Sequence, residues 1–178
     1  MRPGASRNQT RFTVARAASR KQSSAGGVWK PPHRNAIDSP LLLDTHVWLW
    51  ILNGETRHMS SVVIQLLKDV AKAESLLVSD ISFWEVANKS AKGKLSLSID
   101  PVIWLEKAGR APGVSYLEVE RAALIQSTRL RGEPPSDPVD RILLATAQLN
   151  SASLVTCDLQ MIEYASGEDG VSVCDARA

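Results

Sequence analysis

The sequence predicts an α/β fold in which a central, mostly parallel sheet is flanked by helices on both faces. Short apolar runs alternate with amphipathic stretches of ten or more residues, which is the pattern of strand–helix–strand units. The apolar runs are only four to seven residues long and read as strands buried on both faces. Two of these runs end directly in an acidic residue, which places carboxylates where such sheets bind ligands.

The elements follow in order along the chain. Strands are expected in the runs PLLLDT (40–45), SLLVS (75–79), GVSYLEV (113–119), ASLVTCD (152–158) and VSVC (171–174). Helices are expected over 46–52, 60–74, 81–91, 100–109, 118–131 and 138–149, with a further helical turn after Asp158. Ser60 or Ser61 is a suitable N-cap for the second helix, and Asp100 followed by Pro101 begins the fourth.

The charge distribution divides the chain into two parts. Residues 1–37 contain eight Lys or Arg and no Asp or Glu, whereas the remaining 141 residues contain 13 basic and 19 acidic side chains, a net charge of −6. We therefore expect a disordered basic tail over 1–37 and one folded domain over 38–178. The Arg- and Ser-rich tail resembles a transit peptide, but a solvated tail or a misassigned start codon is favoured.

Other compositional features narrow the class of protein. Cys157 and Cys174 each lie in or beside an apolar run and are expected to be reduced core thiols, because two cysteines make neither a disulfide framework nor a zinc site. No run approaches the roughly 20 apolar residues of a membrane helix, and no compact apolar signal segment is present near residue 1. We expect a cytoplasmic protein without membrane contact.

Four acids are placed to meet at one edge of the predicted sheet. Asp44 and Asp158 end strands, Glu85 lies on the helix after the second strand, and Asp140 lies in the first turn of its helix. Two carboxylates 4 Å apart repel by about 4 kcal/mol at an effective dielectric near 20. Such a cluster takes up protons or binds a cation, and all-oxygen ligands favour Mg²⁺ or Mn²⁺ over zinc.

Each acid also has a purely structural interpretation. Asp44 and Asp158 could cap the helices that follow them, and Asp140 would suit the helix dipole behind the capping residue Asp137. Glu85 could form an ion pair with Lys89 one helical turn away. For any one of these acids taken alone, the structural role is favoured. The presence of all four at the same predicted edge of the sheet favours a metal site.

These segments resemble the motifs of a known family. LLLDTHVWLW, VSDISFWEVANKSAKGKL, DPVDRILLATAQ and LVTCD are similar, in order and spacing, to the motifs of PIN-domain proteins, most closely the VapC-type toxins of bacterial toxin–antitoxin pairs. The resemblance covers residue 40 to the C-terminus. It implies a PIN-like fold, Mg²⁺-dependent endoribonuclease activity, homodimers and neutralisation by a small cognate antitoxin.

The resemblance also assigns roles to single residues. By motif, Asp44, Glu85, Asp140 and Asp158 are the catalytic and metal-binding acids, with Asp44 and Asp140 as direct ligands, Asp158 a ligand directly or through water, and Glu85 a ligand or the base that orients the attacking water. Thr45 and Thr156 occupy positions that support the site in the family. Cys157 is a departure, since a polar or basic residue is usual there.

Other residues near the acids in the sequence could have either functional or structural roles. Lys89, Lys92 and Lys94 could bind the phosphates of an RNA substrate, or could form a solvated helix face. His46 is expected to begin a helix rather than act as a base, and Trp48, Trp50 and Trp84 are expected to be core or dimer contacts.

Alternative functions remain at this point. The domain could be a PIN nuclease that processes RNA without being a toxin, or a catalytically silent PIN-like binding module. A receiver-like domain is a third alternative, but the paired acids and phosphoacceptor Asp that it needs are not visible.

Overall fold

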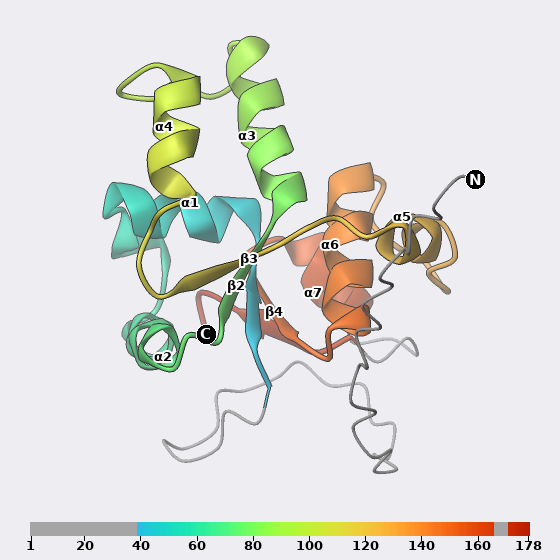
Figure 1. Ribbon diagram of the computed structural model, residues 1–178. Helices are drawn as coiled ribbons and strands as arrows, with labels where there is room; N and C mark the ends of the chain where they lie inside the picture. The colour runs from blue at the N-terminus through green and yellow to red at the C-terminus, as the bar shows by residue number, and fades with distance from the viewer. Residues whose placement is uncertain (1–38, 166–170) are drawn as a thin grey trace, which may run out of the picture.

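The protein contains a five-stranded sheet between two layers of helices (Figure 1). The computed structural model describes residues 39–165 and 171–178, and the predicted basic tail over 1–37 lies outside these residues. The strands are β1 (Leu41–Leu43), β2 (Leu76–Ser79), β3 (Val114–Leu117), β4 (Ser153–Thr156) and β5 (Val173–Asp175). The helices are α1 (Thr45–Asn53), α2 (Ser61–Lys72), α3 (Asp80–Ala91), α4 (Pro101–Ala108), α5 (Arg121–Ser127), α6 (Pro138–Leu149) and α7 (Leu159–Ala165).

All strand pairs are parallel, and the strand order is β3-β2-β1-β4-β5. The first strand is therefore central, and its register aligns Leu43 with Val155 of β4. The carboxyl ends of all strands consequently meet at one edge of the sheet, as the sequence predicts.

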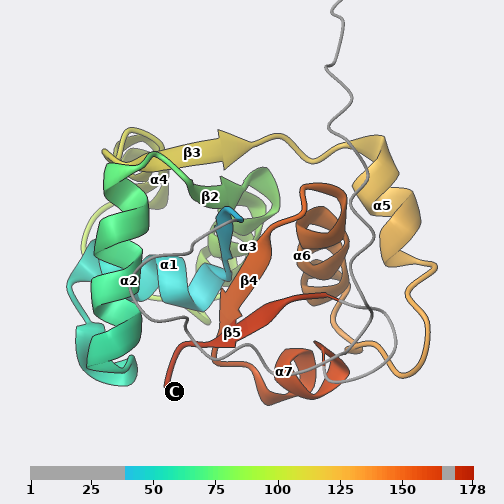
Figure 2. The same cartoon turned by 90° about the horizontal axis from the view of Figure 1, so that it is seen from below.

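Both faces of the sheet are buried. Leu41 and Leu43 point into a cluster with α1, α2, α3 and α4, whereas Leu42 points into a second cluster with α6 and α7. Figure 2 shows α1 and α2 on one side of the strands, with α5, α6 and α7 on the other. This double burial explains why β1 and β4 read as continuous apolar runs rather than as alternating patterns, whereas the edge strand β3 has Ser115 exposed.

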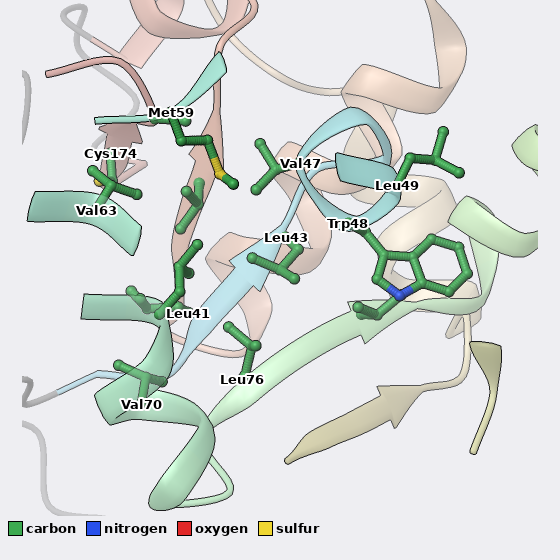
Figure 3. Packing of buried hydrophobic residues seen from close by; sticks show 14 of the residues in the cluster. Leu41, Leu43, Val47, Trp48, Leu49, Met59, Val63, Val70, Leu76 and Cys174 are labelled. Atoms are coloured by element: carbon green, nitrogen blue, oxygen red, sulfur yellow. The ribbon is translucent and has the colours of Figure 1, made fainter. Parts of the chain in front are cut away.

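The first cluster joins the sheet to α1, α2, α3 and α4. Its members pack around β1, with Leu43 near the middle of the labelled group and Trp48 of α1 at one side (Figure 3). The Trp48 ring contacts Phe83 of α3 and Trp104 of α4, with ring centroids 4.8 and 5.5 Å apart respectively. Trp48 is thus a core residue, as expected, and it fixes α3 against α1.

The helix starts follow the predicted capping residues. The side chain of Ser60 accepts a hydrogen bond from the backbone of Val63, and that of Asp100 from Val102 and Ile103. Asp137 caps α6, accepting from the Val139 backbone N–H at 2.7 Å.

Three details differ from expectation. The helix predicted over 118–131 spans only Arg121–Ser127, because residues before it are extended and the hydroxyls of Ser127 and Thr128 bind the last carbonyls of the helix. A short 3₁₀ helix, Thr56–His58, was not predicted, and the last strand begins two residues later than its apolar run. None of these differences moves a candidate site residue.

The thiols agree with the prediction. Cys174 is buried in β5 and Cys157 is half-buried, and both are free. Burial raises the pKa of Cys174 to about 12, so its thiol stays protonated. Among the helices of the described residues, none has the length and apolarity needed to cross a membrane.

Candidate active site

The site is built around Asp44, the residue that follows the central strand. Its backbone N–H donates to the carbonyl of Val155, which continues the β1–β4 ladder by one residue. Its side chain is 3% exposed, and its Oδ2 accepts a hydrogen bond of 2.7 Å from the hydroxyl of Thr156 at the end of β4. Although Asp44 is the N-cap residue of α1, its carboxylate makes no capping hydrogen bond there.

Asp44 lies in an environment that opposes its negative charge. Burial raises its pKa, and the nearby charge of Glu85 raises it further, while the hydrogen bond from Thr156 and the proximity of His46 lower it. A carboxylate held in this way is stabilised by an added cation. The structural interpretation of Asp44 as a simple helix cap is therefore not the arrangement observed.

Glu85 is brought to the same region by α3. Ser79 at the end of β2 caps this helix, and Glu85 lies on its buried side with 6% exposure. Its Oε1 is 2.6 Å from Nζ of Lys89, the i+4 pair that the sequence offered as an alternative role. Helix α3 also contacts α6, the helix that carries Asp140.

Asp140 carries the clearest electrostatic signature. It occupies the third position of α6, behind the cap Asp137 and Pro138. Burial raises its pKa to about 7, and four neighbouring carboxylates contribute in the same direction: Asp137, Asp44, Asp158 and Glu85. The three other predicted acids thus all raise the pKa of Asp140, which means that the four carboxylates lie near enough to repel one another.

Asp158 has a structural role as well. Its Oδ1 accepts hydrogen bonds from the backbone N–H groups of Gln160 and Met161, at 2.7 and 3.2 Å. The Thr156 hydroxyl in turn accepts from the Asp158 backbone at 3.0 Å. These bonds leave Oδ2 of Asp158 as the oxygen available to a ligand, and Thr156 connects Asp158 to Asp44.

The donor set can be compared with what a metal requires. Across residues 39–165 and 171–178, no group of three or more His, Cys, Asp or Glu side chains forms a ready-made metal cage. Mg²⁺ usually keeps several waters and needs only one or two direct carboxylates. Burial and the neighbouring acids raise the pKa values of Asp44 and Asp140, and carboxylates in this situation fit a hydrated hard cation.

Two basic side chains border the acids, and one of their contacts was not foreseen. His46 of α1 has Nδ1 3.9 Å from Oδ2 of Asp44, and its Nε2 is 3.5 Å from Nζ of Lys89. The residues are 43 positions apart, so no local pattern could have paired them. His46 begins a helix as expected, yet it also contacts the site.

Two hydroxyl groups and the outer lysines complete the surroundings. The hydroxyl of Thr45 donates to that of Ser82, a fully buried residue one turn before Glu85 on α3. Ser82 was not singled out from the sequence, although its i, i+3 spacing from Glu85 places both on one helix face. Lys92 and Lys94 are exposed beyond the end of α3.

Comparison with known proteins decides the family. The model of the PIN domain family matches residues 41–167, the larger part of the chain. The protein belongs to the PIN domain family. The resemblance stated from the motifs and the predicted PIN-like α/β fold are thereby confirmed.

Individual relatives agree with this assignment. The PIN domain is 29% identical to ribonuclease VapC22 of Mycobacterium tuberculosis over 121 residues, which cover 68% of this chain and 88% of the relative. Its fold is similar to DNA-bound VapBC from Salmonella typhimurium, at a TM-score of 0.54 and 17% identity over 76% of this chain and 96% of that one. FitAcB from Neisseria gonorrhoeae gives a TM-score of 0.51 at 16% identity, covering 76% and 97% of the two chains.

Proposed function

We propose that this PIN domain is a metal-dependent endoribonuclease and the toxin of a toxin–antitoxin pair. The proposal rests on one observation: the charges of Asp44, Asp158 and Glu85 all raise the pKa of Asp140. Asp44 and Asp158 themselves follow the carboxyl ends of β1 and β4. The motif resemblance to VapC-type toxins and the similarity to a protein named ribonuclease VapC22 support the choice of RNA as substrate.

We assign Asp44 and Asp140 as the residues that would hold Mg²⁺ or Mn²⁺ directly. Asp158 would take part through Oδ2 or through water, because its Oδ1 is occupied by α7. The bound ion would supply Lewis-acid chemistry, lowering the pKa of a water and neutralising the phosphodiester. The residues themselves supply a group of carboxylates, of which Asp44 and Glu85 are buried, and a bound cation would offset their mutual repulsion.

The protein side chains would direct the hydrolysis as follows. Glu85 orients or deprotonates the attacking water, which adds to phosphorus as the P–O3′ bond breaks. The released 3′-oxygen takes up a proton from solvent, so the products are a 5′-phosphate and a 3′-hydroxyl, as the motif resemblance implies. Thr156 holds the Asp44 carboxylate in place through its 2.7 Å hydrogen bond. Lys92 and Lys94, exposed beyond α3, would contact flanking phosphates.

Protein partners are part of the proposal. The solved relatives include VapBC assemblies, and the motif resemblance implies a small cognate antitoxin and a homodimer. Exposed apolar side chains are available for such contacts, among them Trp84 on α3, Val102 on α4 and Ile125 on α5. A toxin acting on cellular RNA would work in the cytoplasm.

The decisive experiment compares the full chain with its Asp44→Asn variant. Induced expression of the wild type should arrest bacterial growth, and the purified protein should cleave RNA in Mg²⁺ or Mn²⁺ but not in EDTA. The variant should do neither while keeping its circular dichroism spectrum. Cleavage without growth arrest would favour an RNA-processing nuclease, and equal cleavage by the folded variant would refute the site.

A further inference from the structure

We infer that Lys89 is an internal counterion of the active site, which neutralises Glu85 in the metal-free protein and competes with the divalent cation for it. This inference rests on the proposed function and deepens it. It makes Lys89 a positioning residue that sets metal affinity, in place of the phosphate-binding role suggested by its position in the sequence.

The first observation is the contact between Lys89 and Glu85. Their charged atoms are 2.6 Å apart, and the Glu85 side chain is 8% exposed whereas that of Lys89 is 30% exposed. Ion pairs on an open helix surface contribute little, because water screens them. Here the carboxylate is removed from water, so its attraction to the ammonium is screened much less.

The second observation is what lies on the other side of the ammonium. Nε2 of His46 is 3.5 Å from Nζ of Lys89, and Nδ1 of the same ring is 3.9 Å from Oδ2 of Asp44. A proton on Nδ1 faces Asp44 and leaves Nε2 as an acceptor towards the ammonium. Lys89 and His46 therefore bridge two acids that come from different elements, Glu85 on α3 and Asp44 after β1.

The consequence is a competition between two cations. A divalent ion that binds Glu85 must share the carboxylate with the ammonium or displace it, and either event costs part of the binding energy. Displacement is feasible because lysine carries its charge on a flexible stem and this side chain is partly exposed. Lys89 would thus stabilise the metal-free protein while weakening its affinity for metal.

The test measures Mn²⁺ binding alone, without RNA, by isothermal titration calorimetry on the full chain. Lys89→Met should bind Mn²⁺ about tenfold more tightly than the wild type. Removing one positive charge that touches a metal ligand is expected to change the metal affinity by a factor of that order. Lys89→Arg keeps the charge and should stay near the wild-type affinity. Lys68→Met, on an exposed residue of α2 outside the site, controls for the change in net charge and should shift affinity less than twofold.

Thermal melting gives an independent readout. Without metal, Lys89→Met should melt at a lower temperature than the wild type, because buried Glu85 is left unpaired. Saturating Mn²⁺ should then raise the melting temperature of Lys89→Met by more than it raises that of the wild type. Equal Mn²⁺ affinity and equal metal-induced shifts in these two proteins would overturn the inference, as would weaker binding by Lys89→Met.

Failure of the proposed function would look different. In that case wild type and Asp44→Asn would show the same Mn²⁺ affinity, or neither would bind. If Asp44→Asn loses Mn²⁺ binding while Lys89→Met leaves it unchanged, the metal site stands and only the counterion role of Lys89 is refuted.

Discussion

Thr156 and Asp44 are 112 residues apart in the chain, yet the Thr156 hydroxyl donates a 2.7 Å hydrogen bond to Oδ2 of Asp44. The parallel register of β1 and β4 brings them together, and both side chains are buried. The same hydroxyl accepts from the backbone N–H of Asp158. One threonine thereby orients two of the four candidate ligands.

The first prediction concerns this threonine. Thr156→Val keeps the shape of the side chain but removes the bond that lowers the pKa of Asp44, so Mn²⁺ affinity and RNA cleavage should both fall by roughly 10- to 100-fold. Thr156→Ser retains the hydroxyl and serves as the matched control, with activity close to wild type. Calorimetry and initial cleavage rates measure the two effects, and a Val variant as active as the Ser variant would show that the bond is dispensable.

The second prediction is the pH dependence of stability. Asp140 has a pKa of about 7 in the folded, metal-free protein and of about 4 in the unfolded chain. The Asp140 carboxylate therefore binds a proton more tightly in the folded state than in the unfolded state. The free energy of unfolding should therefore decline as the pH rises from about 4 to about 7, and the loss should be complete above that range. Urea denaturation in EDTA at several pH values measures this slope.

Asp140→Asn should remove much of that slope. Above pH 7 the variant should be more stable than the wild type by on the order of 1–2 kcal/mol, discounted for the partial exposure of Asp140. Asp100→Asn, which alters an exposed capping carboxylate on α4, is the control and should leave the slope intact. A clear loss of stability in Asp140→Asn would instead favour the helix-dipole role of this acid.

The third prediction separates the two roles of Asp158. Asn caps helices about as well as Asp, so Asp158→Asn should keep the stability of α7 and lose only the charge. Asp158→Ala loses the cap too and should be less stable by about 1 kcal/mol. Both variants should cleave RNA more slowly. Equal melting temperatures for the two would mean that the hydrogen bonds from Gln160 and Met161 contribute little.

The fourth prediction concerns residues 1–37. The described residues already contain all five strands and both hydrophobic clusters, so deletion of 1–37 should leave the melting temperature and the cleavage sites unchanged. The eight basic side chains could bind RNA by charge alone, so the deletion should weaken RNA binding only at low salt. A truncated protein that does not fold, or that cuts elsewhere, would place the domain boundary before residue 38.

Much of the architecture could be predicted because it depends on local patterns. Apolar runs such as Leu41–Leu43 are short and buried on both faces, and Asp100 and Asp137 precede prolines at helix starts. The pairing of Glu85 with Lys89 follows from helical spacing alone. The end of α5 was less predictable. The hydroxyls of Ser127 and Thr128 donate hydrogen bonds to the last carbonyls of this helix, which would accept backbone N–H groups if the helix were longer.

The sequence by itself determined the alternation of strands and helices, the parallel sheet and the four acids at its carboxyl edge, since these depend on periodicity, capping and chain order. Only the tertiary structure decided that Thr156 binds Asp44, that His46 meets Lys89, and that the pKa of Asp140 rises to about 7. These properties depend on strand register, helix packing and burial. They involve residues far apart in the chain, and local sequence patterns do not determine the distance between such residues.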